Sequence, residues 1–571
     1  MVFERSTSSF VARSGLAALA LLLSCCGRAP RFPLREPLER DPDARPFAPQ
    51  PAEYYSPFAW DGANQLVFRP ISRFFAVDPA GPAANVNALD EVPDSSWFTN
   101  RLGAHALTPE DVARGSCPAQ SLDPLAPDGA WLIDKGKANG ANPGFRIRVE
   151  GLGKFMLKSD PPSEPERATG ATAIAARIYH AIGYHAACDS VVYFRPEILR
   201  LKPGLTVTTN TGVTHPLDRE HLNEMLAGAS RRNGRVRMVA SAWLPGNTIG
   251  PYKYDGLRDD DPNDIIPHED RRELRGARLI AAWLNHFDSR EQNTMDTFIT
   301  PDGAPPGSGY VRHYIIDMGD CFGSVWADDG ISRRLGHSYV LDFGYVAEDF
   351  VTLGAISRPW ERARRTAHVF NYFSARDFDP ESWRGEYPNP AFMRMTEADG
   401  AWMARILARF TDPLVAAAVR AGQYEPAAER YLTQVLIARR DAILRRYLSR
   451  LSPIGDVSLS GSTLCGTDLA RNAGVIPNES LSFRVSVYAG AQLAPVRDFR
   501  VTSPQPAQLC VEISHRNLPS QISPDDARRY LVVDLDNGYA RGPLRVHLYD
   551  LGQSRGFSIA GIERPESHDP P

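Results

Sequence analysis

Apolar and polar positions between residues 128 and 194 predict several strands around one helix. Residues 145–149 alternate with a period of two, as a half-buried strand does. Residues from about 165 to 182 predict a helix that stops before Gly183, because glycine is favoured just past a helix end. The expected order is strand, glycine-rich loop, strand, strand ending in Lys158, helix, strand. The strand-like runs are 131–133, 145–149, 155–158 and 191–194.

After residue 235 the pattern predicts one more strand and then mostly helices. Residues 235–244 are strand-like and end at Leu244-Pro245-Gly246. A helix then opens near Pro267 and runs into His286. Its apolar residues recur at steps of three and four, which gives it one buried face. These residues are Leu274, Ala277, Ile280, Ala281 and Leu284. The chain is expected to be irregular from 317 to about 355, with helices near 358–374, 391–421 and 425–452.

From about residue 456 the period returns to two. Leu481, Phe483, Val485 and Val487 alternate with polar residues, and Asn537-Gly538 is a hairpin-type turn. This pattern predicts a small antiparallel β-sandwich. Cys465 and Cys510 both lie in this segment, so they form the best candidate disulfide pair.

The first residues have the pattern of an export signal. Arg5 and Arg13 precede an apolar run at 16–23, which is shorter than the roughly 20 residues that a transmembrane helix needs. The run ends in Leu22-Leu23-Ser24-Cys25, which resembles a bacterial lipobox. We expect cleavage before Cys25 and a lipid on its sulfur. The mature lipoprotein would be anchored in the outer membrane and would face the periplasm or the cell surface. The alternative is an ordinary signal peptide cut near Ser24.

Composition is that of a globular protein with two to four domains. The 571 residues are 43% hydrophobic and 23% charged, with a formal net charge of -4, which gives no case for nucleic acid as a partner. The chain has seven cysteines. Setting aside Cys25 and Cys26 leaves an odd number, so we expect at least one free thiol or a further pairing in addition to Cys465–Cys510.

Three separated motifs stand in an order that suits phosphoryl transfer. Lys158 ends a strand, residues 286–293 read H-x-D-x-x-x-x-N, and Asp317-Met318-Gly319 follows another strand-like run. Phosphoryl transfer needs phosphates held, metal ions placed and the attacking hydroxyl oriented, and it needs little covalent help from the protein. Singly, each motif is more often a solvated lysine, a capped turn or a structural histidine. Their joint order on suitable elements is what indicates a site.

On these motifs, the segment from about 128 to 452 resembles the atypical protein kinases, including the HipA-type, CotH-type and secretory-pathway kinases. The resemblance implies ATP or another nucleotide, with Mg²⁺ or Mn²⁺, and a protein or small-molecule hydroxyl as acceptor. It implies Asp288 as catalytic base, with Arg290 beside the transferred phosphate. Asn293 and Asp317 would be metal ligands. The nucleotide would contact residues of the predicted β-rich lobe and the linker, namely Lys158, Lys137, Gly140, Glu166 and Gly246.

The expected fold class is therefore α+β, a two-lobed kinase-like fold followed by a β-sandwich. The expected divisions are a lipoprotein signal peptide (1–25), a disordered tether (26–55) and an extension that packs on the main domain (56–127). A β-rich N-lobe (128–255), a helical C-lobe (256–455) and the sandwich (456–571) follow.

Two other functions stay open on the sequence alone. The predicted helix at 165–182 has Thr172 or Arg177 where a lysine-pairing acid would be expected, which favours a pseudokinase-type binding module of the cell envelope. A metal-dependent hydrolase is the second alternative. It would use His286, His313 and His337 together with Asp288 or Asp317.

Overall fold

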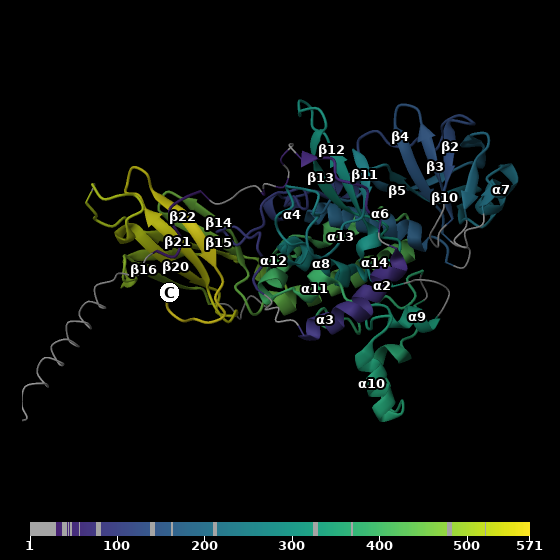
Figure 1. Cartoon of the computed structure of the whole chain (residues 1–571). Coiled ribbons are helices and arrows are strands. Elements are labelled where there is room, and N and C mark those ends of the chain that lie inside the picture. The colour runs from purple at the N-terminus through teal and green to yellow at the C-terminus, as the bar shows by residue number, and fades with distance from the viewer. Residues whose placement is uncertain are drawn as a thin grey trace, which may run out of the picture. The chain divides into compact units, whose positions relative to one another are not determined.

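The computed structural model describes residues 30–36, 41, 43, 45, 48–55, 57–75, 81–137, 143–160, 164–208, 214–323, 329–366, 369–476, 482–519 and 521–571. The chain divides into two compact units (Figure 1). The larger unit comprises residues 38–87 and 91–448, and the C-terminal unit comprises 1–37, 88–90 and 449–571. Both contain sheets, and the larger unit is also rich in helices, so the expected α+β class is correct.

The larger unit contains a seven-stranded sheet, and Figure 1 shows its strands β2, β3, β4 and β10 side by side. Its main path runs β5-β10-β4-β3-β2-β6, with β9 paired to β10. Within this sheet the β2–β6 pair is parallel and the other pairs are antiparallel. Leu157 and Ile147 belong to the apolar cluster on one face of this sheet. The strands are β2 (Trp131–Gly136), β3 (Gly144–Val149), β4 (Gly153–Lys158), β5 (Asp189–Phe194), β6 (Leu199–Leu201), β9 (Arg231–Arg232) and β10 (Arg235–Ala242).

Helix α6 (Arg167–Ile182) packs against β5 and β10. Every residue of it except His180 is buried, because small residues such as Gly170 let neighbours approach closely. A Cβ at Gly170 would lie 2.4 Å from the Tyr424 hydroxyl. The helix ends before Gly183, which has a φ of 149°. Glycine adopts this backbone conformation more easily than residues with a Cβ. The expected helix therefore exists, and its predicted end is correct.

The larger unit also contains a four-stranded sheet and helix α8 (Arg272–Leu284), which packs against other helices. The sheet has the order β1-β13-β12-β11. Its strands are β1 (Ala48–Pro49), β11 (Asn247–Gly250), β12 (Thr294–Ile299) and β13 (Ser308–Ile315). The sequence pattern indicates only the end of the β12–β13 hairpin, at the strand-like run before Asp317. Pairing of the two strands places the end of β13 beside Asn293, with Ile316 N donating to Asn293 O at 2.9 Å.

Helices complete the larger unit. Among the described residues they are α2 (Phe58–Ala63), α3 (Arg69–Phe75), α4 (Arg101–Ala104), α5 (Pro109–Arg114), α7 (Arg219–Ala227), α9 (Asp329–Arg334), α10 (Phe343–Thr352), α11 (Pro390–Met393), α12 (Glu397–Leu407), α13 (Asp412–Arg420) and α14 (Pro426–Tyr447). The helix expected at 358–374 is wrong: a 3₁₀ turn at Pro359–Arg362 and further turns stand there. The single helix expected at 391–421 is three helices, because Thr396 caps α12 and Thr411 precedes a Pro at the start of α13.

Buried charge ties the N-terminal segment to α8. The Arg271 side chain is fully buried and ion-pairs with Asp41 (3.0 Å), Asp43 (3.7 Å) and Glu273 (3.5 Å). Burial raises the pKa of Asp43 to about 6, although Arg271 opposes this shift. The expected tether at 26–55 is therefore wrong over its described part, since Asp41 and Asp43 are buried and β1 pairs with β13. A buried carboxylate without a partner is costly, and the ion pairs with Arg271 are what allow Asp41 and Asp43 to be buried.

The C-terminal unit holds two antiparallel sheets, ordered β14-β15-β19-β18 and β17-β16-β20-β21-β22. Side chains of both sheets, such as Val511 and Val533, share one apolar cluster. Cys465 and Cys510, the expected pair, face each other on β15 and β19 and form a disulfide. The strands are β14 (Ile454–Ser460), β15 (Thr463–Asp468), β16 (Arg484–Ala489), β17 (Ala494–Val496), β18 (Phe499–Thr502), β19 (Gln508–Ile513), β20 (Tyr530–Asp536), β21 (Leu544–Asp550) and β22 (Phe557–Glu563).

The boundaries and cysteines differ in detail from the expected organisation. The C-terminal unit begins at Ser449 rather than 456, and it also takes in residues near Phe32, which packs on its sheet. A second disulfide, Cys117–Cys188, lies in the larger unit, and Cys321 is free and buried. No helix in the part of the chain that the structure describes is both long and apolar enough to cross a membrane.

Replacing Arg271 with Met should lower the free energy of unfolding of the larger unit by about 3 to 5 kcal/mol, because it leaves several buried carboxylates without their cation. The matched control is Arg148→Met, since Arg148 is 56% exposed and pairs with Asp134 at 3.4 Å. Such an exposed pair contributes about 1 kcal/mol or less. Urea unfolding followed by circular dichroism measures both variants. Equal losses for the two would contradict a structural role for the Arg271 cluster.

Candidate active site

The loop of residues 285–293 is held at the C-terminal end of α8. Asn285 has a left-handed φ of 51° and ends the helix, and His286 N then donates to Ala281 O at 2.9 Å. Arg439 of α14 donates to the last carbonyls of the helix, at Ala282 (2.6 Å) and Trp283 (3.0 Å). A cation at this end also suits the helix dipole. The loop is therefore fixed from both its own helix and a neighbouring one.

Within this loop Asp288 and Asn293 contact each other directly. Asn293 Nδ2 donates to the Asp288 carbonyl at 2.8 Å, across the 3₁₀ turn at Glu291–Asn293. The amide nitrogen of Asn293 is used in this way, so its oxygen is the atom it can offer to a cation. The H-x-D-x-x-x-x-N spacing thus closes a small loop with the two polar side chains on it.

Lys158 and Asp317 meet although they are 159 positions apart in the sequence. Lys158 Nζ lies 2.7 Å from Asp317 Oδ1. The Lys158 side chain is 16% exposed and that of Asp317 is 49% exposed, so the pair stands at the edge of solvent. Lys158 lowers the pKa of Asp317, which stays ionised. Burial opposes the charge on Lys158, but Asp317 outweighs it and raises the lysine pKa. Asp317 has a left-handed φ of 54°, which turns the chain sharply after β13.

Gly319 lets this turn pack closely on α6. A Cβ there would lie 3.3 Å from Thr172 Oγ1 and 3.4 Å from Ala168 Cβ. Arg167 Nη1 donates to the Gly319 carbonyl at 3.0 Å. Thr172, which stands where an acid was sought, donates instead to the Ala168 carbonyl at 2.8 Å. Arg177 likewise donates to carbonyls, to that of Ala173 within the helix at 2.9 Å and to that of Ala113 outside it at 2.7 Å, so both side chains are engaged with the backbone.

Asp189 is the acid near Lys158 that sequence reasoning missed. It opens β5, and the strand register aligns it with Ser241 of β10 and Met156 of β4. The same face of the sheet carries Lys158, two residues further along β4. Burial raises the pKa of Asp189 to about 6, while a hydrogen bond with Ser241 and the charge of Lys158 lower it. No local pattern signals this placement, because it depends on strand pairing across β10.

The other expected nucleotide contacts are divided. Burial and the charge of Lys158 lower the pKa of Lys137 to about 8, while Asp317 opposes this shift. Lys137 therefore lies near both of these residues. Glu166 accepts a hydrogen bond from Arg232 at 3.1 Å rather than meeting Lys158. Gly246 adjoins the β12–β13 hairpin, since a Cβ on it would lie 2.3 Å from the Phe298 carbonyl oxygen. Gly140 and the expected lipidation site Cys25 lie outside the described residues.

Asp288 belongs to a cluster of charged groups around the loop. It ion-pairs with Arg290, which also pairs with Glu386, an acid that the sequence did not single out. The Asp288 backbone N–H donates to Asp320 Oδ2 at 3.0 Å. Burial raises the pKa of Asp288 to about 7; Arg290 opposes this shift and Asp320 adds to it. A carboxyl group that titrates near neutrality can accept and release a proton at physiological pH.

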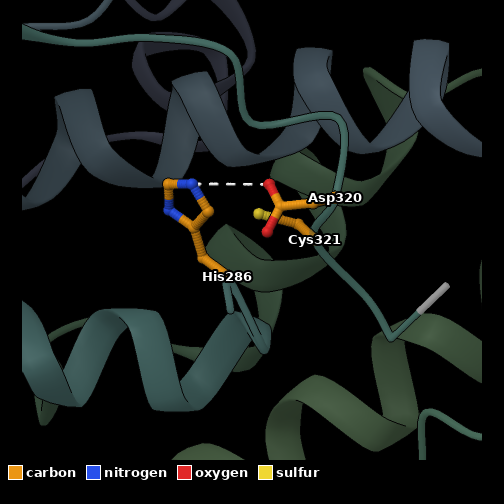
Figure 2. A group of neighbouring side chains, drawn as sticks. All are labelled: His286, Asp320 and Cys321. Carbon is orange, nitrogen blue, oxygen red and sulfur yellow. Dashed lines mark ion pairs between the residues drawn. The ribbon is translucent and has the colours of Figure 1, made fainter. Parts of the chain in front are cut away.

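His286, Asp320 and Cys321 form a second small group next to Asp288, which Figure 2 shows. One nitrogen, oxygen or sulfur atom from each lies within 4.8 Å of the others. His286 Nε2 is 3.4 Å from Asp320 Oδ1, and His286 Nδ1 is 2.9 Å from the Tyr179 hydroxyl. Burial lowers the pKa of His286 to about 4 and raises that of Asp320 to about 7. The sequence indicated His286 but not its two neighbours.

The histidines of the expected hydrolase site have separate partners. His313 Nδ1 lies 2.6 Å from Asp296 and its ring stacks on Trp97. His337 stacks on Trp360. Within the described ranges, neither histidine joins His286 in a group with metal-ligand spacing. The structure therefore does not bring together the ligand set that the hydrolase hypothesis needs.

A large cavity of about 860 Å³ is not lined by Lys158, Asp288 or Asp317. It lies along β4, β5 and β10, beside the 243–245 segment and the Cys117–Cys188 disulfide. Among the described residues that line it are basic side chains but no carboxylate. The basic residues are Arg101, His180, His185, Arg235 and Arg312.

The donors around Asp317 fit a magnesium nucleotide chemically. Mg²⁺ prefers carboxylate and carbonyl oxygens, which Asp317 and Asn293 offer, and Lys158 and Lys137 supply cations for phosphate oxygens. Asp317 is ionised and half exposed, so one of its oxygens can reach a solvated cation. Comparison of the chain with protein-family models, curated proteins and solved structures gives no significant match, so the site is interpreted from its geometry.

Asp189→Asn should change how stability depends on pH. The folded-state pKa of Asp189, about 6, lies above its ordinary value of 3.8, so the native state binds this proton more tightly than the unfolded chain. Stability should therefore fall as pH rises through this window, by up to roughly 3 kcal/mol. Asn keeps the size and removes the titration. Relative to wild type, the variant should gain stability between about pH 4 and 7 in chemical unfolding. If the unfolding free energies of the variant and of wild type changed in parallel with pH, the folded-state pKa of Asp189 would not be raised.

Proposed function

We propose that the chain is an exported lipoprotein whose larger unit is a two-lobed, protein-kinase-like phosphotransferase. The observation that carries this proposal is the 2.7 Å pair between Lys158 at the end of β4 and Asp317 after β13. A strand lysine and a post-strand acid are the two groups that must converge on the phosphates and their cation. The loop that holds Asp288 and Asn293 adjoins the residues that follow Asp317, through the bond from Asp288 N to Asp320.

Each group has a role that its environment supports. Lys158, aided by Lys137, binds phosphate oxygens of ATP or another nucleotide. Asp317 and Asn293 hold Mg²⁺ or Mn²⁺, which neutralises charge on those phosphates. Asp288 accepts the proton of an acceptor hydroxyl, which its raised pKa suits. Arg290, paired with Asp288 and Glu386, neutralises charge on the transferred phosphate. Asp189 takes the place of the acid that α6 lacks.

The C-terminal unit and the N-terminal signal complete the proposal. The two sheets that share a core form a β-sandwich with a binding or packing role. Two disulfides suit an oxidising compartment outside the cytoplasm. Cys25 would carry the lipid and hold the protein at the outer membrane.

A binding module without turnover is the second candidate, and one contact favours it. Lys158 and Asp317 neutralise each other directly, so a nucleotide must compete with this ion pair. A scaffold of the pseudokinase type would keep the same fold and loop while binding a partner or a nucleotide weakly.

Nucleotide binding by the purified mature chain tests the proposal. Calorimetry with ATP and Mg²⁺ should give saturable binding, which Lys158→Met and Asp317→Ala each weaken at least tenfold. Lys154→Met is the matched control, because Lys154 lies on the same strand and contacts the Trp243 ring instead. It should bind like wild type. Equal affinity in Lys158→Met, or no binding of any nucleotide by wild type, would overturn the proposed site.

Phosphoryl transfer separates the enzyme from the binding module. Asp288→Asn should retain Mg²⁺-nucleotide affinity within about threefold and lower turnover at least a hundredfold, since a general base contributes about 10²- to 10⁴-fold. Nucleotide hydrolysis and autophosphorylation, followed with radiolabelled ATP, provide the readout before an acceptor is identified. Identical turnover in wild type and Asp288→Asn would remove Asp288 from the role of base.

A further inference from the structure

His286, Asp320 and Cys321 come from two segments that meet beside the candidate active site. His286 follows the end of α8, and the other two lie in the turn after β13. All three are buried, at 1%, 8% and 0% exposure. Figure 2 shows an imidazole nitrogen facing a carboxylate oxygen, with the thiol sulfur beside it. Nothing in the proposed phosphoryl transfer uses these three side chains together.

Two atoms of this group are buried without a hydrogen bond. Among the described residues, His286 Nε2 and Asp320 Oδ1 have no hydrogen-bond partner, although they lie 3.4 Å apart. Leaving a buried polar atom unsatisfied costs about 1 to 3 kcal/mol. A nitrogen and an oxygen that face each other in this way need a metal cation or a shared proton between them.

We propose that His286, Asp320 and Cys321 bind a divalent cation of the zinc class, at a site distinct from the Lys158–Asp317 pair. Zinc–nitrogen and zinc–oxygen bonds of about 2.0 to 2.2 Å at tetrahedral angles separate the two ligand atoms by roughly 3.3 to 3.5 Å. The Nε2 to Oδ1 separation of 3.4 Å agrees with this edge. A thiolate ligand favours zinc over Mg²⁺, which prefers oxygen.

Charge balance supports the same ion. One carboxylate and one thiolate together compensate a divalent cation, so the buried group becomes neutral as a whole. Binding would release the thiol proton, since only the thiolate is a metal ligand. Three protein ligands leave a fourth position for water or another oxygen, as at zinc centres with an open site.

The far atoms of two ligands are already oriented by neighbours. His286 Nδ1 contacts the Tyr179 hydroxyl at 2.9 Å, which leaves Nε2 for the metal. Asp320 Oδ2 accepts the Asp288 N–H at 3.0 Å, which leaves Oδ1. Such outer hydrogen bonds hold ligands in place at known metal centres. The bond from Asp288 means that a cation here would also fix the loop that carries the proposed base.

Cobalt substitution tests this site without relying on activity. The full mature chain, stripped with a chelator, should bind one Co²⁺ and develop visible d–d bands together with a thiolate charge-transfer band. Zinc should displace the cobalt and remove both features. Cys321→Ser should lose the charge-transfer band, and Asp320→Asn should weaken Co²⁺ at least tenfold. His337→Gln is the matched control, because His337 stacks on Trp360 elsewhere, and its spectrum should match wild type.

The outcomes also separate this site from the proposed nucleotide site. Asp317→Ala should keep the cobalt spectrum, and Cys321→Ser should keep Mg²⁺-ATP affinity, with circular dichroism confirming that each variant is folded. Absence of the charge-transfer band in folded wild type would overturn the metal site and indicate a proton shared between His286 and Asp320. Equal Co²⁺ affinity in wild type, Asp320→Asn and Cys321→Ser would overturn the ligand assignment.

Discussion

The larger unit depends on the compensation of buried arginines around α8. Arg271, Arg272 and Arg275 are almost completely inaccessible to solvent. Each needs acids or carbonyls from distant parts of the chain, because a lone buried charge is prohibitively costly. Asp399 of α12 meets both Arg272 and Arg275, and Asp41 meets Arg271. Hydrophobic burial gathers these helices, and the charge pairs specify which segments can stand next to them.

The candidate active site inherits its position from this arrangement. α8 is fixed at its start by the arginine cluster and at its end by Arg439, so the loop after it has little freedom. Strand β13 ends just before Asp317, which lies opposite Lys158. Three stretches that are far apart in sequence therefore present their polar groups together. Such convergence of groups with opposed pKa shifts, as at Asp288 and Asp317, is a recurrent property of functional sites.

Local patterns predicted the elements that carry the motifs, and they did so for physical reasons. Alternation identified β3, a short apolar run identified β4, glycine marked the end of α6, and helical spacing identified α8 up to His286. Expectations failed where local pattern does not decide the outcome. Asp41 and strand β1 lie in a stretch of sequence without an apolar period, and their contacts are with distant parts of the chain, Arg271 and β13. Asp189 and Glu386 were missed because strand register and loop packing place them, not sequence spacing.

The attachment of Phe32 to the C-terminal unit bears on how the protein would sit at a membrane. Phe32 packs among the strands of this unit, and its carbonyl accepts a hydrogen bond from the Tyr549 hydroxyl at 2.9 Å. Position 32 lies only seven positions after Cys25 in the sequence. A fully extended stretch of that length spans about 25 Å. If Cys25 carries the lipid that we propose, the C-terminal unit lies within about that distance of the bilayer surface. The connection between lipid and folded unit is then much shorter than the expected tether of residues 26–55.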